Sequence, residues 1–333
     1  MMLMVLFSGS SSFTRQIRSF SLPPRIRDLQ SKRIRGFQPK AVLPSNVRGL
    51  VASQNLRGGF SLPLPIQRTV KVIAGMNFLG FVISIIAGGH THLDLLGTGA
   101  FVVSALSSHQ LAPPAIRSAP RQLLITSLVS IWGTRLAGFL FYRVLQSRND
   151  ARLDELMNTT SGAATFWGLS YLWGQLVILP QAMVLNIRPI VPIGIGGCAC
   201  AVLSMTGIAL EAIADWQKFC FKKATKQGEN KFCDIGLWKV SQHPNYAGEI
   251  LTWLGIFGLA VPVLRANPGA TKRLAIAATG PTFLTFLLAG QARGDIGNAN
   301  ELAAKKFSGD VKYEEYIKNT PLIFPTSLSS LRE

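Results

Sequence analysis

Charged residues are scarce in this chain, which restricts the kind of solvent that its surface can face. Only 15% of its 333 residues are Asp, Glu, Lys or Arg, whereas a soluble domain carries about 25%. Six apolar stretches are nearly free of acids, and several reach the roughly 20 residues that a helix needs to cross a hydrocarbon core. They cover residues 72–89, 122–145, 163–185, 190–213, 247–264 and 273–291. A soluble bundle is disfavoured, because its helices would need polar outer faces that these stretches lack.

The hydropathy pattern therefore predicts an all-α, polytopic membrane protein with six transmembrane helices. Residues 94–107 would add a seventh helix, or form a re-entrant or interfacial piece, because the segment is short. Counting crossings places the loops 146–162 and 214–246 and the tail 292–333 on one side of the membrane. Fourteen Lys and Arg lie there, against six in the opposite loops, which orients the first group inward. The polar chemistry is thus expected on one face.

Acids are almost absent from the first 60 residues, which hold ten Lys or Arg and one acid, Asp28. This segment is also rich in Ser and Pro, a composition typical of an organelle transit peptide. We therefore predict a leader and linker over 1–60 and a single helical membrane domain over 61–333. A chloroplast membrane is favoured, with mitochondrion or endoplasmic reticulum as alternatives. The leader carries nine (ten minus one) of the +18 net charges, so no nucleic-acid partner is predicted.

Cysteine and histidine are few, with four of each in the chain. Zinc sites need cysteines and histidines at characteristic short spacings, and this sequence has none, so no metal is predicted. The cysteines are Cys198, Cys200, Cys220 and Cys233. In the first spans the titratable residues other than Lys71 are His90, His92, Asp94 and His109. None of them stands out as a catalyst, and the catalytic residues stay unassigned.

The segment from Glu211 to Glu249 carries most of the chemistry-bearing residues. Glu211, Asp215, Lys218 and Lys222 recur at i, i+4, i+7 and i+11, which places them on one face of a helix. This stripe is either a solvated face where a span leaves the bilayer or one side of a binding site.

A second helix is expected to begin at Pro244, since the first helical position tolerates a missing N–H. Such a helix start also offers free N–H groups to a phosphate. Asn245 and Glu249 are four residues apart and face the same way at the membrane boundary. A carboxylate there is costly unless a partner satisfies it. Arg135, inside span 122–145, is a functional candidate for the same reason, the alternatives being an ion pair with an acid on another helix or snorkelling.

These residues also resemble a known family. The pattern ADxQK, the run Gly236-Leu237-Trp238 and the motif SxHPNYxGE are similar to the DUF1295 family, which is related to the C-terminal domains of steroid 5α-reductases. The resemblance covers about residues 120–326 and includes Trp132–Arg135, Asn149–Arg152 and a Tyr-x-x-Tyr tail. It implies a helical membrane fold that binds NADPH and reduces an activated C=C bond in a lipid-like substrate, such as a sterol, isoprenoid or fatty acyl group.

By this resemblance Asp215, Asn245 and Glu249 would contact the nicotinamide or ribose, while Arg135 and Lys222 or Lys223 would hold the phosphates. The full cofactor-binding set that we predict is Arg135, Asp215, Lys218, Lys222, Trp238, His243, Asn245, Tyr246 and Glu249. Two departures stand out. Gln242 replaces an arginine of the family motif, and no Glu precedes Glu155 and no Tyr precedes Tyr142. Steroid 5α-reductases polarise the substrate carbonyl with a Glu and a Tyr from their N-terminal half. This pair is therefore missing from its expected place.

A rival interpretation comes from isoprenylcysteine methyltransferases, which carry a similar His-Pro-x-Tyr-x-Gly turn and a similar tail. In that case His243, Tyr246 and Glu301 would line an S-adenosylmethionine pocket and Arg293 would face the substrate. A non-catalytic membrane protein that retains the fold is the third alternative. Fold likeness alone does not decide among them.

Overall fold

The structure is a computed structural model that describes residues 62–87, 91–146, 157, 159–225, 231–266, 268–296 and 299–325. The leader predicted over 1–60 and the motif Asn149–Arg152 lie outside these residues. Within them the chain forms α-helices, one 3-10 turn and no strand. The elements are α3 (Leu64–Ala87), α4 (Leu93–Gln110), α5 (Pro114–Arg117), α6 (Pro120–Gln146), α8 (Thr160–Val177), α9 (Leu179–Val184), α10 (Ile195–Ala224), η2 (Gly236–Lys239), α11 (Pro244–Arg265), α12 (Ala270–Arg293), α13 (Ala299–Lys306) and α14 (Val311–Asn319).

Five of the described helices, α3, α6, α10, α11 and α12, are long and apolar enough to cross a membrane. Their outward faces carry large apolar side chains, including Ile195 at 92% and Phe286 at 70% exposure. Such surfaces are stable against hydrocarbon and unfavourable against water. The all-α membrane fold predicted from the sequence is confirmed.

The described residues contain fewer qualifying spans than the six or seven predicted, and the predicted span 163–185 is among those that do not qualify. The stretch 163–185 is not one helix, since it divides at Ile178 into α8 and α9. Pro180 follows directly, and proline cannot donate to the carbonyl of Leu176 four residues earlier and clashes with it. That carbonyl instead packs against Gly280 of α12. The short segment 94–107 forms helix α4, which is 18 residues long.

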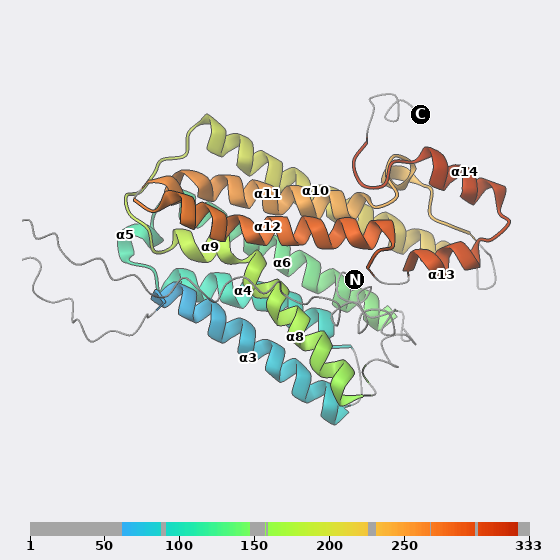
Figure 1. Ribbon diagram of the computed structural model, residues 1–333, viewed down its shortest axis with the longest axis horizontal. Helices are drawn as coiled ribbons and strands as arrows, with labels where there is room; N and C mark the ends of the chain where they lie inside the picture. The colour runs from blue at the N-terminus through green and yellow to red at the C-terminus, as the bar shows by residue number, and fades with distance from the viewer. Residues whose placement is uncertain are drawn as a thin grey trace, which may run out of the picture. The chain divides into compact units, whose positions relative to one another are not determined.

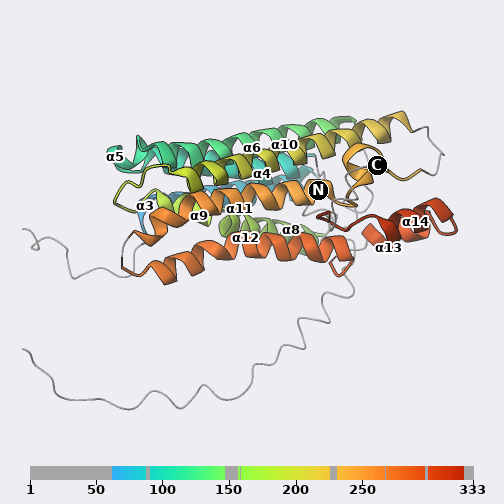
Figure 2. The same ribbon diagram turned by 90° about the horizontal axis from the view of Figure 1, so that it is seen from above.

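The helices pack side by side with their ends gathered at two opposite ends of the bundle (Figures 1 and 2). The last turns of α6, α10 and α12 and the first turns of α8 and α11 share one end with α13 and α14. These are the ends that the sequence assigned to one side of the membrane.

An aromatic cluster of Phe101, Trp132, Trp173 and Trp253 forms the centre of the core. The ring centroids of Phe101 and Trp173 lie 4.7 Å apart, and those of Trp132 and Trp253 lie 5.0 Å apart. These side chains come from α4, α6, α8 and α11, so the cluster holds four helices together. Aromatic rings in tilted and edge-to-face contact add stability beyond the area that they bury.

Helices α10 and α11 approach unusually closely, because glycines face each other across their contact. A Cβ on Gly248 of α11 would lie 2.5 Å from the backbone nitrogen of Glu211 and 2.7 Å from the carbonyl oxygen of Gly207. Small residues allow such close backbone contact between membrane helices. The contact places Glu211 of α10 beside Glu249 of α11.

Candidate functional site

A buried ion-pair network joins α6 to α10 next to the aromatic cluster. The guanidinium of Arg135 contacts Glu211 at 2.6 Å and Asp215 at 3.1 Å. Trp132, one turn before Arg135, donates its indole N–H to the same Glu211 carboxylate at 3.0 Å. Glu211 and Asp215 are one turn apart on α10, so a single arginine reaches both. The alternative of an ion pair for Arg135 is therefore the arrangement observed.

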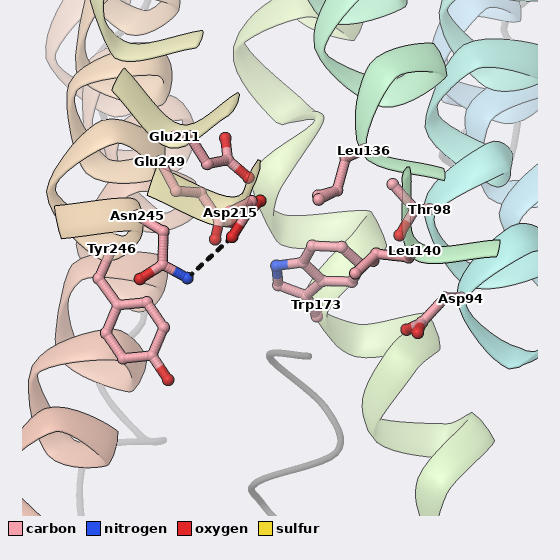
Figure 3. Close-up of a pocket in the computed structure, with 10 residues that line it drawn as sticks. All are labelled: Asp94, Thr98, Leu136, Leu140, Trp173, Glu211, Asp215, Asn245, Tyr246 and Glu249. Carbon is pink, nitrogen blue, oxygen red and sulfur yellow. Dashed lines mark hydrogen bonds between the residues drawn. The ribbon is translucent and has the colours of Figure 1, made fainter. Parts of the chain in front are cut away.

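Helix α11 contributes a second row of polar side chains to this network. The side-chain amide of Asn245 donates to Asp215 at 3.3 Å, as the dashed line in Figure 3 shows. Glu249, one turn later, is only 6% exposed. Among the described residues, neither Oε1 of Glu249 nor Oδ1 of Asn245 has a hydrogen-bond partner. Buried acceptors without partners are costly, so these two atoms are suited to donors on a ligand.

The two rows border a pocket (Figure 3), which lies beside the second half of α10 and the first turns of α11. Its empty space, including the part open to solvent, is about 480 Å³. Residues from α4, α6, α8, α10 and α11 line it, and they are Asp94, Thr98, Leu136, Leu140, Trp173, Glu211, Asp215, Asn245, Tyr246 and Glu249. One side of the pocket is thus acidic and amide-bearing, and the side formed by α6 is apolar.

Two of the predicted cofactor residues, Lys218 and Trp238, contact each other near the start of α11. The ammonium of Lys218 lies 3.9 Å from the centroid of the Trp238 ring, at cation–π distance. Trp238 donates its indole N–H to the carbonyl of Ala214 at 2.9 Å. The side chain of Gln217 accepts from the backbone N–H of Leu237 at 2.9 Å. Together these contacts attach the Gly-Leu-Trp turn, η2, to α10.

The start of α11 holds His243 and Tyr246, whose rings stack with centroids 4.9 Å apart. Tyr246 lines the pocket, whereas His243 does not. Burial, with a smaller effect of Lys218, lowers the pKa of His243 to about 3. The imidazole is therefore neutral at pH 7, and it brings no positive charge to a phosphate.

Gln242, the residue that replaces an arginine of the family motif, attaches the C-terminal tail to the site. Its side-chain amide donates to the carbonyls of Ile317 at 3.0 Å and Thr320 at 2.7 Å. Its backbone N–H donates to the carbonyl of Pro321. The Tyr316 hydroxyl donates to the Trp238 carbonyl at 2.8 Å. The neutral amide at 242 thus has a structural role in holding α14.

Replacing Gln242 by alanine should release the tail without unfolding the bundle. Two hydrogen bonds to carbonyls are lost, each worth about 1 kcal/mol, so local opening of α14 should become at least about fivefold more populated. Cleavage after Glu314 and Glu315 by a glutamate-specific protease should accelerate accordingly. The exposed neighbour Lys239→Ala serves as the control. Equal cleavage rates in the two variants would show that Gln242 does not restrain the tail.

The structure brings most of the predicted site residues together and leaves others apart. Asp215, Asn245, Tyr246 and Glu249 line the pocket, with Arg135 paired to its acidic wall. Lys222 is exposed in the last turn of α10 and does not line it. Glu301 and Arg293, which the methyltransferase interpretation requires, are also exposed and outside the lining.

Several lining residues were not in the predicted set. Glu211 was visible in the sequence as the start of the polar stripe, and its spacing from Asp215 was the available signal. Asp94 is one of several titratable residues in the first spans, and in the structure it pairs with Arg143 at 3.7 Å. Two other titratable residues of the first spans, His92 and His109, do not line the pocket. His92 contacts Ser84, and His109 contacts Thr126. No local pattern pointed to Trp173.

The fold and the pocket define a helical membrane protein with an acid-lined pocket at one end of its bundle. Residues 80–320 match the family described as "Protein of unknown function (DUF1295)". The chain therefore belongs to the DUF1295 family. No curated protein and no solved structure matches it.

Proposed function

We propose that this protein is an NADPH-dependent reductase of an activated C=C bond in a lipid-like substrate. The observation that carries the proposal is the pair of buried, unpartnered acceptors, Oε1 of Glu249 and Oδ1 of Asn245, in the pocket lining. A nicotinamide riboside is rich in donors, because its carboxamide and ribose hydroxyls all carry N–H or O–H groups. The donor set and the acceptor set are therefore complementary.

Three features that resemble the reductases meet at this one place, which further supports the proposal. Asp215 of the ADxQK pattern lines the pocket, and its Gln217 and Lys218 hold the Gly-Leu-Trp turn. Asn245 and Glu249 of the HPNYxGE motif line the same pocket. By contrast, the tail residue Glu301 of the methyltransferase interpretation is outside it.

When bound, NADPH would supply the hydride for the reduction. The protein's own part is to bind, orient and exclude water. Arg135 contacts two of the carboxylates and offsets one of their two negative charges, so the acidic wall can accept hydrogen bonds with less excess negative charge. Leu136 and Leu140 give the pocket an apolar side on which a lipid-like substrate can lie, and their burial keeps water from the reacting atoms. Lys222 and Lys223, in the last turn of α10, are the cations that the family resemblance offers for the phosphates.

Ligand-induced stabilisation of the full chain in detergent tests this function. NADPH at 100 times its dissociation constant should stabilise the protein by about 2.7 kcal/mol. Glu249→Ala should weaken affinity tenfold or more, since hydrogen bonds to charged groups are worth about 1.5–3 kcal/mol. At the same NADPH concentration the stabilisation should then fall to about 1.4 kcal/mol or less.

Glu301→Ala is the matched control, because it removes a carboxylate that is exposed and outside the pocket. It should leave the NADPH effect unchanged. Stabilisation by S-adenosylmethionine alone, abolished by Glu301→Ala, would establish the methyltransferase function instead. Stabilisation by neither ligand would favour a non-catalytic protein.

A further inference from the structure

The three tryptophans of the aromatic cluster differ in what their indole N–H groups meet. Trp132 donates to Glu211. Within the described residues the N–H groups of Trp173 and Trp253 have no acceptor, although both side chains are buried, Trp173 at 3% exposure. Trp173 lines the pocket and Trp253 does not. Trp173 is therefore a spare donor in the lining of the same pocket that holds the spare acceptors of α11.

The position of this donor is fixed by packing. The ring of Trp173 contacts Phe101, with centroids 4.7 Å apart, and lies 6.4 Å from the ring of Trp132. Figure 3 shows its indole nitrogen on the side of the ring that faces Asp215 and Asn245. A rigid buried N–H that lacks a partner costs about 1–3 kcal/mol, and a native site normally recovers such a cost through a ligand or water.

Three buried side-chain atoms of the described pocket lining have no hydrogen-bond partner, and they are one donor, on Trp173, and two acceptors, on Asn245 and Glu249. The ligand group that complements them has two N–H or O–H donors and one acceptor. A carboxylate has no donor, an ammonium group has no acceptor, and a single hydroxyl has only one donor. A primary carboxamide has two N–H donors and one carbonyl acceptor, and it matches all three atoms.

We propose that the indole N–H of Trp173 donates a hydrogen bond to the carboxamide oxygen of the nicotinamide, whose two N–H groups donate to Asn245 and Glu249. This inference rests on the proposed NADPH function and extends it to a residue of α8, outside the HPNYxGE motif. The indole N–H is not acidic enough to release its proton near neutral pH, so Trp173 positions the nicotinamide ring.

Substitution by phenylalanine tests the role, since it removes the N–H and retains an aromatic ring. Trp173→Phe in the full chain, in detergent, should raise the dissociation constant of NADPH on the order of fivefold to tenfold, as expected for one hydrogen bond. Trp253→Phe is the matched control, because it removes an equally unpartnered indole N–H outside the pocket. It should change the constant by less than about twofold.

Cofactor analogues provide a second readout, part of which uses the unmodified protein and so does not depend on how well Trp173→Phe folds. The 3-acetylpyridine analogue of NADPH keeps the carbonyl oxygen and lacks both N–H groups. Glu249→Ala should weaken NADPH but not this analogue, whereas Trp173→Phe should weaken both. On the unmodified protein, an analogue with no carbonyl group should bind more weakly than the acetylpyridine analogue.

The two failures are distinguishable. If the unmodified protein does not bind NADPH, the proposed function fails and this inference fails with it. If NADPH binds and Trp173→Phe leaves both dissociation constants unchanged, only the role of Trp173 is overturned, and the function stands. Equal affinity for analogues with and without the carbonyl oxygen overturns that role in the same way.

Discussion

Replacing Arg135 by methionine is expected to destabilise the protein by about 3–5 kcal/mol, because it leaves Glu211 and Asp215 as uncompensated buried charges. Both carboxylates contact the Arg135 guanidinium and are less than 10% exposed. Methionine retains much of the length and the apolar packing of the side chain, so the loss reflects the charge. Unfolding of the purified protein by denaturant in detergent measures the effect.

The charge argument is tested by removing all three charges together. The triple variant Arg135→Met, Glu211→Gln, Asp215→Asn removes the positive charge together with the two carboxylates that it contacts, and its new amide at position 211 retains an acceptor for the indole N–H of Trp132. It should recover most of the lost stability, as buried ion pairs are often replaceable by neutral groups of similar size. A triple variant as unstable as the single variant would show that Arg135 stabilises by packing alone.

The same network shows what could be predicted from the sequence and what could not. Hydropathy located the helices, and the spacing of Glu211 from Asp215 and of Asn245 from Glu249 placed each pair on one face. Local patterns contain that information, because helical periodicity relates residues three and four apart. The break between α8 and α9 was also signalled locally, by Pro180.

The partners across the bundle were not available from any local pattern. Arg135 and Asp215 are 80 positions apart in the chain, and Trp132 and Glu211 are 79 apart. The sequence alone allowed Arg135 either an ion pair or a phosphate. Only packing decides which face of α6 meets α10. Trp173 is hidden for the same reason, since a tryptophan in an apolar helix ordinarily indicates core packing.

The sequence also left open the roles of the side chains of Lys218 and Gln242. Both belong to motifs that suggested cofactor binding, yet Lys218 lies over the ring of Trp238 and Gln242 binds carbonyls of the tail. Side chains with several donors satisfy whichever acceptors the fold places near them. A motif therefore identifies the neighbourhood of a site more reliably than the role of each member.

The close contact of α10 and α11 gives the second large expected effect, at Gly248. A valine there is expected to destabilise the protein by about 3 kcal/mol, the upper end for overpacking, and to abolish stabilisation by NADPH. The atoms that its Cβ would meet are the backbone nitrogen of Glu211 and the carbonyl oxygen of Gly207. Backbone atoms cannot rotate away as a side chain can, so the two helices must separate.

Separation of the helices would move Glu211 and Glu249 apart. Glu211 forms part of the contact with Gly248, and Glu249 is the next residue in the chain after Gly248. The expected result is therefore a joint loss of stability and of ligand response in the same detergent experiment. Gly138→Val is the control, since a Cβ at Gly138 of α6 would meet no atom within 4 Å and its position is exposed. If Gly248→Val responded to NADPH like the unmodified protein, the acidic wall of the pocket would not depend on how closely α10 and α11 pack, and the geometry on which the cofactor proposal is built would lose its support.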